Sequence, residues 1–382
     1  MKINFIKLLY EEENDMKKNK GITLVALVVT IVVLLILAGV SINLVLGNNG
    51  IIAKAKDAET KSAEASQNDL KGMNGLVSEM EGALAGNGST GSGSGNGNTG
   101  SGNNFVTKNT EVTYPDGKVW IPEGFKVAGD SASTVQGGVV IEDKDGNQFV
   151  WVPVATLADY KRRTWYTGNG SFSDYSEALP EDERASVDAY KGFYIGRYEA
   201  GDKENTEAKT LRSSNDVTKT VTIKAGQVPY NYVTRTQAVS LAEGFATKQG
   251  YKAKTKLVSS YAWDTTIAFI EKTVNNYGSS SSQGNYSDTS VTYKDITDES
   301  KPEKTKAENS SLLVATGQTT PVCNIYDMGG NVFEWTTEFC SDSPSAGRGG
   351  DYGYYTNYPA GYRVTLSDSA TDNYGFRLTL FM

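Results

Sequence analysis

Histidine is absent from this chain, and cysteine is present only twice. Without histidine, the sequence excludes Ser-His-Asp triads, histidine general bases and histidine metal sites. Two cysteines are too few for a zinc site built from four thiolates. Basic clusters are also scarce, since beyond the N-terminal region only residues 161–163 place three cations together, and the net charge is −8. We therefore predict no nucleic-acid partner, because such a protein needs a patch that neutralises phosphates.

Long apolar runs are equally rare, and the only uncharged one covers residues 22–46. With 38% apolar residues overall, the chain is not a polytopic membrane protein. As a helix this run would extend about 37 Å, enough to cross a bilayer core of about 30 Å with some tilt. Lys17, Lys18 and Lys20 precede it. The positive-inside rule then predicts a single-pass cell-membrane protein with a cytoplasmic N-terminus and an extracellular remainder. A cleaved secretory signal is the alternative, although its apolar run is usually shorter.

The junction around Gly21 resembles the leader of type IV prepilins: a basic stretch, a glycine, then Ile22, a threonine and a leucine. In that family a prepilin peptidase cuts after the glycine. The resemblance implies a leader at residues 1–21, cleavage between Gly21 and Ile22, and a transmembrane, pilin-like helix at residues 22–46. It also implies the peptidase, and other pilin subunits, as partners. Ala26 stands where the family usually has glutamate, which weakens the expectation of a pilus more than that of an anchor.

The next two segments predict a spacer. Residues 47–85 are rich in alanine, lysine and glutamate, and we expect a helical stalk there, with a pilin-type packing helix as the alternative. Residues 86–104 contain only glycine, serine, asparagine and threonine. Such a linker cannot bury a core and is predicted to be a flexible coil with an end-to-end distance of about 22–26 Å. A flexible tether suits the display of a folded head.

Residues 105–382 are long enough to bury a large core, and short β signals dominate them. The turn at residues 143–147 predicts a hairpin, and its Asp-x-Asp-Gly pattern lacks the later glutamate of an EF-hand calcium loop. Ser260 is a candidate N-cap for a helix at residues 263–274. Residues 275–310 are predicted to form a surface loop. Few helices and many short strands predict an α+β fold. The expected elements are strands at residues 139–141, 149–152 and 193–199 and helices at residues 236–245 and 263–274.

Three motifs near the C-terminus come in a fixed order. Residues 326–336 read Tyr-Asp-Met-Gly-Gly-Asn-Val-Phe-Glu-Trp-Thr, residues 348–350 read Arg-Gly-Gly, and residues 375–377 read Gly-Phe-Arg. Together they resemble the formylglycine-generating enzyme (sulfatase-modifying factor) family across most of residues 105–382. The resemblance implies a C-type-lectin-like head. Its glycines suit close backbone approach, its aromatic residues suit a core, and Arg348 and Arg377 are candidates for buried pairing with carboxylates.

A departure from this family's pattern predicts that the head is not an enzyme. The family's enzymes oxidise a substrate cysteine with copper held by two cysteines shortly after the Arg-Gly-Gly motif. The matching positions here are Tyr354 and Pro359, and the chain's two cysteines both precede Arg348. We therefore expect no catalytic residues and no required cofactor. An oxidase of the same type with atypical ligands is the alternative.

Cys323 and Cys340 flank the first motif and lie outside the membrane by the topology given above. We predict a disulfide between them, which would stabilise the fold by about 3 kcal/mol in the chain-entropy model. Two buried free thiols are the alternative.

Asp327, Asn331 and Glu334 bring oxygen ligands close together in the chain, and such ligands suit Ca²⁺. The related fold commonly binds calcium near this motif, so the resemblance makes Ca²⁺ a candidate cofactor. Ordinary buried hydrogen bonding, with the carboxylates paired to arginines, is the alternative.

Residues 351–362 contain five tyrosines in twelve positions, and the other residues are mostly small or polar. Antibody paratopes have this composition, because tyrosine offers large contact area at low entropy cost. Residues 367–373 continue with the same residue types. We predict a binding surface for a macromolecule, protein or glycan; a structural loop over the core is the alternative. The predicted ligand-binding residues are Asp351, Tyr352, Tyr354, Tyr355, Asn357, Tyr358, Tyr362, Ser367, Asp368, Asp372 and Asn373.

This layout also resembles the variable proteins of diversity-generating retroelements. In that family a lectin-like domain carries a variable stretch between Arg-Gly-Gly and Gly-Phe-Arg, rewritten by adenine-directed copying. The resemblance implies a hypervariable binding loop. The sequence thus predicts a surface-displayed, membrane- or pilus-anchored, non-catalytic binding protein, with a structural minor pilin as a further alternative.

Overall fold

The computed structural model describes residues 104–165, 174–280, 283–298, 300, 302–340 and 345–382. The predicted leader, transmembrane helix and stalk, and nearly all of the predicted linker, lie outside these residues. Within the described part of the chain, no helix combines the length and the apolar character that crossing a membrane requires.

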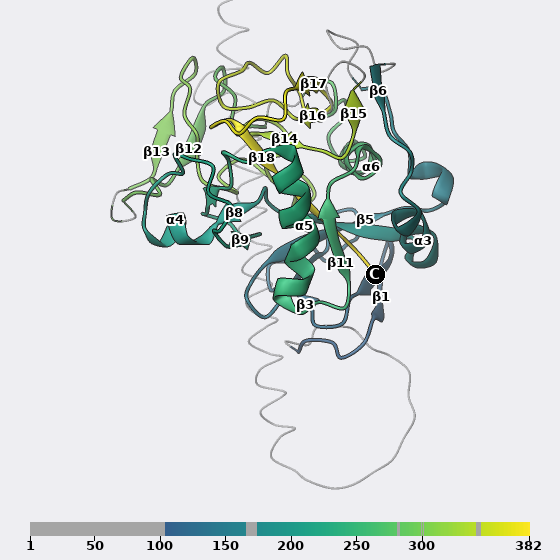
Figure 1. The fold of residues 1–382 in the computed structure, drawn as a ribbon. Coiled ribbons are helices and arrows are strands. Elements are labelled where there is room, and N and C mark those ends of the chain that lie inside the picture. Colours follow the sequence, from purple (N-terminus) through teal and green to yellow (C-terminus); the bar gives the residue numbers. More distant parts are fainter. Residues whose placement is uncertain (1–103, 166–173, 281–282, 299, 301, 341–344) are drawn as a thin grey trace, which may run out of the picture. The chain divides into compact units, whose positions relative to one another are not determined.

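The head is an α+β fold in which short strands predominate, as the sequence predicts (Figure 1). Its largest sheet has six strands, each antiparallel to its neighbours. In spatial order they are β11 (Lys254–Leu257), β19 (Leu378–Phe381), β7 (Gly192–Gly196), β5 (Gln148–Pro153), β4 (Val140–Glu142) and β3 (Lys126–Val127).

A second sheet of four strands carries the three C-terminal motifs. Its order is β17 (Arg363–Leu366), β16 (Ser345–Arg348), β14 (Phe333–Trp335) and β18 (Tyr374–Phe376). The β14–β18 pair is parallel and the other two pairs are antiparallel. Arg348 and Arg363 are paired neighbours in β16 and β17, so the segment between them forms one long loop.

Four smaller sheets surround these two. They are β1 (Thr110–Tyr114) with β2 (Gly117–Ile121); β10 (Val228–Pro229), β8 (Gly201–Asp202) and β9 (Val221–Thr222); β12 (Val291–Tyr293) with β13 (Lys304–Lys306); and β15 (Phe339–Cys340) with β6 (Tyr175–Ser176). The described helices are α3 (Glu181–Tyr190), α4 (Lys203–Glu207), α5 (Arg235–Gln249), α6 (Ser260–Ile270) and the short 3₁₀ helix η1 (Leu157–Asp159).

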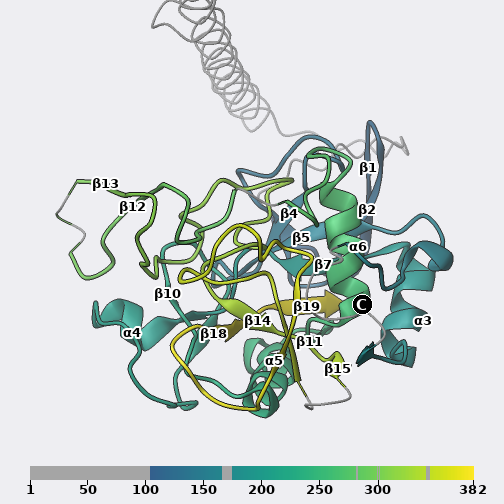
Figure 2. The ribbon, with the colours of Figure 1, turned by 90° about the horizontal axis from the view of Figure 1, so that it is seen from above.

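The large sheet is buried on both faces. Alternate residues of β5 point to opposite sides, so Phe149 and Trp151 join one apolar cluster while Val150 and Val152 join the other. Helix α5 packs into the first cluster, beside β11, and α6 packs into the second (Figures 1 and 2). Because β5 has two buried faces, it reads as a continuous apolar run and not as an alternation.

Several predicted elements are confirmed with changed boundaries. The hairpin forms as β4 and β5, and the carboxylate of Asp143 accepts hydrogen bonds from the main-chain N–H groups of Asp145 and Asn147 within its turn. Helix α5 is longer than predicted, since Thr234 forms a capping box at its start and Gly250 ends it with φ +75°. Strand β7 ends three residues earlier than predicted.

Two expectations are corrected, and one helix is not predicted. The N-cap of α6 is Ser259, whose hydroxyl accepts from the N–H of Ala262, so Ser260 is the first helical residue and the helix ends at Ile270. Helix α3 is not predicted, because Val187 is the one apolar residue among its buried residues and its sequence shows no apolar stripe. Residues 275–310 are not only a surface loop, since Asn285 and Tyr286 are fully buried.

Candidate functional site

The loop between β16 and β17 is held at its base by buried ion pairs. Arg348 ends β16 and its Nη2 lies 2.6 Å from Oδ1 of Asp264 on α6. Arg363 begins β17, and its Nη2 lies 2.6 Å from Oδ2 of the same carboxylate and its Nε 2.9 Å from Oε2 of Glu338. Burial by itself raises the pKa of Asp264, but the two guanidinium groups hold it below its ordinary value. The predicted buried pairing of Arg348 is confirmed.

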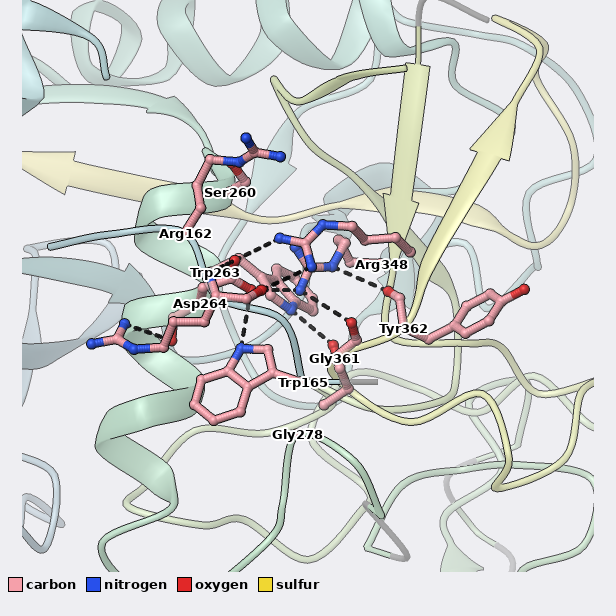
Figure 3. A network of polar contacts seen from close by, with 12 residues as sticks. Arg162, Trp165, Ser260, Trp263, Asp264, Gly278, Arg348, Gly361 and Tyr362 are labelled. Carbon is pink, nitrogen blue, oxygen red and sulfur yellow. Dashed lines mark hydrogen bonds and ion pairs between the residues drawn. The ribbon is translucent and has the colours of Figure 1, made fainter. Parts of the chain in front are cut away.

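Further hydrogen bonds hold the end of this loop against α6, β16 and the segment after α6 (Figure 3). The indole N–H of Trp263 donates to the carbonyl of Ala360 at 2.9 Å, and Nε of Arg348 donates to the carbonyl of Tyr362 at 3.1 Å. The N–H of Gly361 donates to the carbonyl of Gly278. Residues 360–362 are therefore part of the buried framework.

The loop begins at two glycines that no other residue could replace without strain. Gly349 and Gly350 have φ values of +89° and +75°, the left-handed region. A Cβ on Gly350 would lie 2.5 Å from the carbonyl oxygen of Tyr358, so the chain crosses itself closely at this point. The Arg-Gly-Gly motif thus sets both the base and the entry turn of the loop.

The second predicted arginine pair is also confirmed. Arg377 donates to both oxygens of Glu334, with its Nη2 2.6 Å from Oε1, and to the carbonyls of Gly196 and Tyr326. This fork-shaped contact joins the four-stranded sheet to the end of β7. Phe333, Trp335 and Phe376 are buried, as the motif predicts.

The predicted calcium residues are occupied by protein contacts. Asp327 accepts from the N–H of Gly317 and the hydroxyl of Thr319, and Asn331 accepts from the side chain of Asn285. Both oxygens of Glu334 face a guanidinium cation. Among the described residues, no group of three acidic or thiol side chains is arranged to hold a metal ion. A calcium ion at Glu334 would have to displace the ion pair with Arg377, so the residues as arranged here do not fit a calcium ion.

The predicted disulfide is wrong. Cys323 and Cys340 are buried free thiols in two different apolar clusters. The sulfur of Cys323 lies 3.3 Å from the hydroxyl oxygen of Thr273, and that of Cys340 lies 3.1 Å from the hydroxyl oxygen of Thr365. Each cysteine packs within a different apolar cluster. The spacing of the two cysteines along the chain cannot show that they lie in separate clusters. Neither thiol lies at the positions that match the family's copper ligands, where this chain has the exposed Tyr354 and the buried Pro359.

We call residues 351–362 the tyrosine loop and residues 367–373 the adjacent turn. Asp351 joins them: its Oδ1 accepts from the N–H groups of Gly353 and Tyr354 at 2.7 and 3.1 Å, and its Oδ2 accepts from the amide of Asn373 at 2.6 Å. Burial raises the pKa of this carboxyl group. With 1% of its surface exposed, Asp351 supports the site from beneath and does not face a ligand.

Four aromatic rings form a series of contacts whose two ends are buried and whose second ring, Tyr354, is exposed. Phe333 contacts Tyr354 with ring centroids 5.4 Å apart, Tyr354 contacts Tyr358 at 4.6 Å, and Tyr358 contacts Tyr362 at 4.7 Å. All three contacts are edge-to-face, a favourable arrangement of aromatic rings. Tyr362 is buried, so among the predicted residues it is also a support.

The other predicted residues lie at or near the surface. Tyr354 is 41% exposed and Tyr355 is 56% exposed. Tyr352 is half-buried and donates its hydroxyl hydrogen to Asp372 at 2.8 Å, which links the loop to the adjacent turn. Tyr358 and Asn373 are also half-buried. The remaining exposed residues are Asn357, Ser367, Asp368 and Asp372.

Three residues beside the loop and the adjacent turn are not predicted from the sequence. Asp288 accepts hydrogen bonds from the N–H and the hydroxyl of Thr356 at 2.9 and 2.8 Å. The N–H of Ser287 donates to the carbonyl of Tyr354, so the segment before β12 lies against the loop (Figure 1). Tyr232, with φ +51°, bonds through its N–H to the carbonyl of Thr371. Nothing in the local sequence of these three residues signals this role.

Comparisons with known proteins add little to this geometry. No family model and no curated protein matches the chain. The structure of PvdO from Pseudomonas aeruginosa is similar at 18% identity and a TM-score of 0.34, over 64% of this chain and 98% of that one. The structure of CarF is similar at 13% identity and a TM-score of 0.33, over 55% of this chain and 95% of that one.

Proposed function

We propose that this protein is a cell-surface binding protein whose head holds a macromolecular ligand through the tyrosine loop and the adjacent turn, without catalysis. One observation carries the proposal. Tyr354 and Tyr355 are 41% and 56% exposed, on a loop whose base is held by buried ion pairs and whose first residues are held by Asp351. A loop that only covered the core would bury these rings.

Rigid exposed tyrosines suit binding for an energetic reason. A ligand that covers them gains apolar contact area. The supporting contacts already hold the loop in one conformation, so binding loses little further conformational entropy. The hydroxyl groups keep hydrogen-bonding capacity at the edge of the interface. Contact with Tyr354, Tyr355, Asn357 and the outer parts of Tyr352 and Tyr358 is accordingly the core of the proposed surface.

The proposal includes a C-type-lectin-like head of the sulfatase-modifying-factor type, on the strength of the motif resemblance. It also includes diversification of the loop. The separation of supports from exposed positions favours this, because outward residues can change while Asp351, Tyr362 and Arg363 keep the backbone in place. The surrounding DNA tests it: a reverse-transcriptase gene and a near-copy of codons 348–377 richer in adenine are expected.

The N-terminal part of the proposal rests on sequence alone. Residues 22–46 would anchor the protein in the cell membrane, with the head outside, after a prepilin peptidase cuts between Gly21 and Ile22. Mass spectrometry of protein extracted from membranes is expected to find Ile22 at the N-terminus. An intact N-terminus in cells that have the peptidase would leave a simple anchor.

The binding test uses full-length protein, a random dodecapeptide display library and a glycan array as probes. The substitution Tyr355→Ala is expected to lower the affinity of the protein for the selected probes by about thirtyfold, or about 2 kcal/mol, with little change in Tm. Phe105→Ala is the matched control, since it removes another exposed ring outside the tyrosine loop. A fall in Tm with binding proportional to folded protein would instead show a structural loop.

Two alternatives have their own outcomes. Copper-dependent oxidation of a cysteine-containing peptide by the purified protein would make it an oxidase with atypical ligands. Loss of pili on deletion, with no effect of the tyrosine substitutions on any probe, would make it a structural minor pilin.

A further inference from the structure

The exposed charges of the tyrosine loop and the adjacent turn are all negative. Residues 351–373 contain three aspartates and one arginine. That arginine, Arg363, is buried between Asp264 and Glu338, and Asp351 is buried as well. The charges that remain at the surface are those of Asp368 and Asp372.

The neighbouring elements extend this pattern. Asp288 is half-buried at the edge of the loop, where it holds Thr356. Among the described residues near these carboxylates, Arg235 and Lys306 direct their side-chain N–H groups to main-chain carbonyls. The guanidinium of Arg235 donates to Thr336 and Thr337, while its main-chain N–H and the hydroxyl of Thr236 donate to the carboxylate of Asp368 at 2.6 and 2.7 Å. Lys306, which is 3% exposed, donates to the carbonyls of Tyr286, Thr289 and Ser310.

We infer that the partner bound by the tyrosine loop is a protein segment that presents arginine or lysine side chains. This inference rests on the proposed function and names the chemistry of its ligand. Arginine and lysine side chains make two kinds of favourable contact at such a surface. Tyrosine rings attract cations over their faces, and exposed carboxylates form ion pairs with them. A neutral glycan would gain nothing from the carboxylates, and an anionic glycan would be repelled.

The acidic surface also has a kinetic consequence. Complementary charge steers association, and salt screens it, since the Debye length falls from about 10 Å at 0.1 M to about 3 Å at 1 M. Binding of a basic segment is therefore expected to weaken about tenfold or more between 0.05 and 0.5 M NaCl.

The test extends the library selection on full-length protein. Enriched dodecapeptides are expected to carry an excess of arginine and lysine over the starting library. The double variant Asp368→Asn, Asp372→Asn keeps an oxygen acceptor at each position, and is expected to bind the enriched peptides about tenfold more weakly. The matched control Glu207→Gln, Glu243→Gln removes two exposed carboxylates from α4 and α5, and is expected to change binding less than about twofold.

The outcomes separate the two proposals. Enriched peptides that need Tyr355 but carry no basic excess, or that respond equally to both double variants, would overturn this inference and leave the binding function standing. Peptides that bind Tyr355→Ala as well as the original protein would overturn the binding function itself. Enrichment of no peptide, with tyrosine-dependent binding on the glycan array, would show a glycan ligand and overturn the inference alone.

Discussion

Glu183 shows how strongly one buried carboxyl group can link stability to pH in this head. It accepts hydrogen bonds from the hydroxyls of Tyr160 and Ser259 at 2.6 and 2.7 Å. Burial nevertheless raises its pKa from 4.5 to about 7. The protonated form is therefore favoured in the folded state, whereas the unfolded chain ionises near its ordinary value.

The pH dependence follows from the sign of this shift. The stabilising contribution of Glu183 is full below pH 4.5 and is lost as the pH rises through about 7, a change of about 3 kcal/mol. We expect Glu183→Gln to remove this part of the pH dependence, so that its free energy of unfolding falls less than that of the original protein between pH 4.5 and pH 8. Urea titrations at several pH values measure it, with the exposed Glu181→Gln as control. Parallel curves for Glu183→Gln and the original protein would contradict the assignment.

Asp351 is expected to control the order of the tyrosine loop. Its replacement by alanine leaves the N–H groups of Gly353 and Tyr354 without their acceptor and releases Asn373. A lost buried acceptor costs about 1–3 kcal/mol. We expect Asp351→Ala to speed hydrogen exchange at residues 353 and 354 and to weaken ligand binding. Asp288→Ala serves as the comparison, because it frees Thr356 instead. Unchanged exchange at residues 353 and 354 would mean that other contacts hold the loop.

At the scale of elements, α6 and the β16–β17 pair depend on one carboxylate. Asp264 pairs with Arg348 and Arg363, all three buried. Removing one partner of a buried ion pair leaves charges uncompensated and typically costs about 3–5 kcal/mol. We expect Asp264→Asn to lower the free energy of unfolding by about that amount in denaturant titrations.

The exposed pair of Asp188 and Lys191 provides the control for this prediction. Both side chains are more than half exposed, and surface pairs contribute about 0–1 kcal/mol. Asp188→Asn is therefore expected to have little effect. Equal losses from Asp264→Asn and Asp188→Asn would show that the buried pairs do not hold the base of the loop.

For the whole molecule, we expect residues 105–382 to fold as an independent soluble unit. They contain two large apolar clusters and a six-stranded sheet with two buried faces. Limited proteolysis of the full-length protein is expected to cut first within residues 86–104, because their composition cannot bury a core. Mass spectrometry of the fragments identifies the cut sites. Early cutting at many sites across residues 110–270 would contradict a single folded head.

Local signals made much of this head predictable. The sequence predicts the middle of α5, residues 236–245, and capping by Thr234, Gln237 and Gly250 sets the observed ends of the helix. Two adjacent serines made the N-cap of α6 ambiguous by one position. Helix α3 is not predicted because Val187 is the one apolar residue among its buried residues, so its sequence shows no apolar stripe.

The sequence by itself determined the α+β class, the hairpin of β4 and β5, the buried pairing of Arg348 and Arg377, and a tyrosine-rich segment beside these motifs. Only the tertiary structure decided which tyrosines face solvent, that the cysteines stay apart, and that Asp264 and Asp288 hold the loop. The reason is distance along the chain: Asp264 meets Arg348 across 84 residues, and Asp288 meets Thr356 across 68. Composition and short-range spacing carry no information about such contacts, because they form only when separate elements pack together.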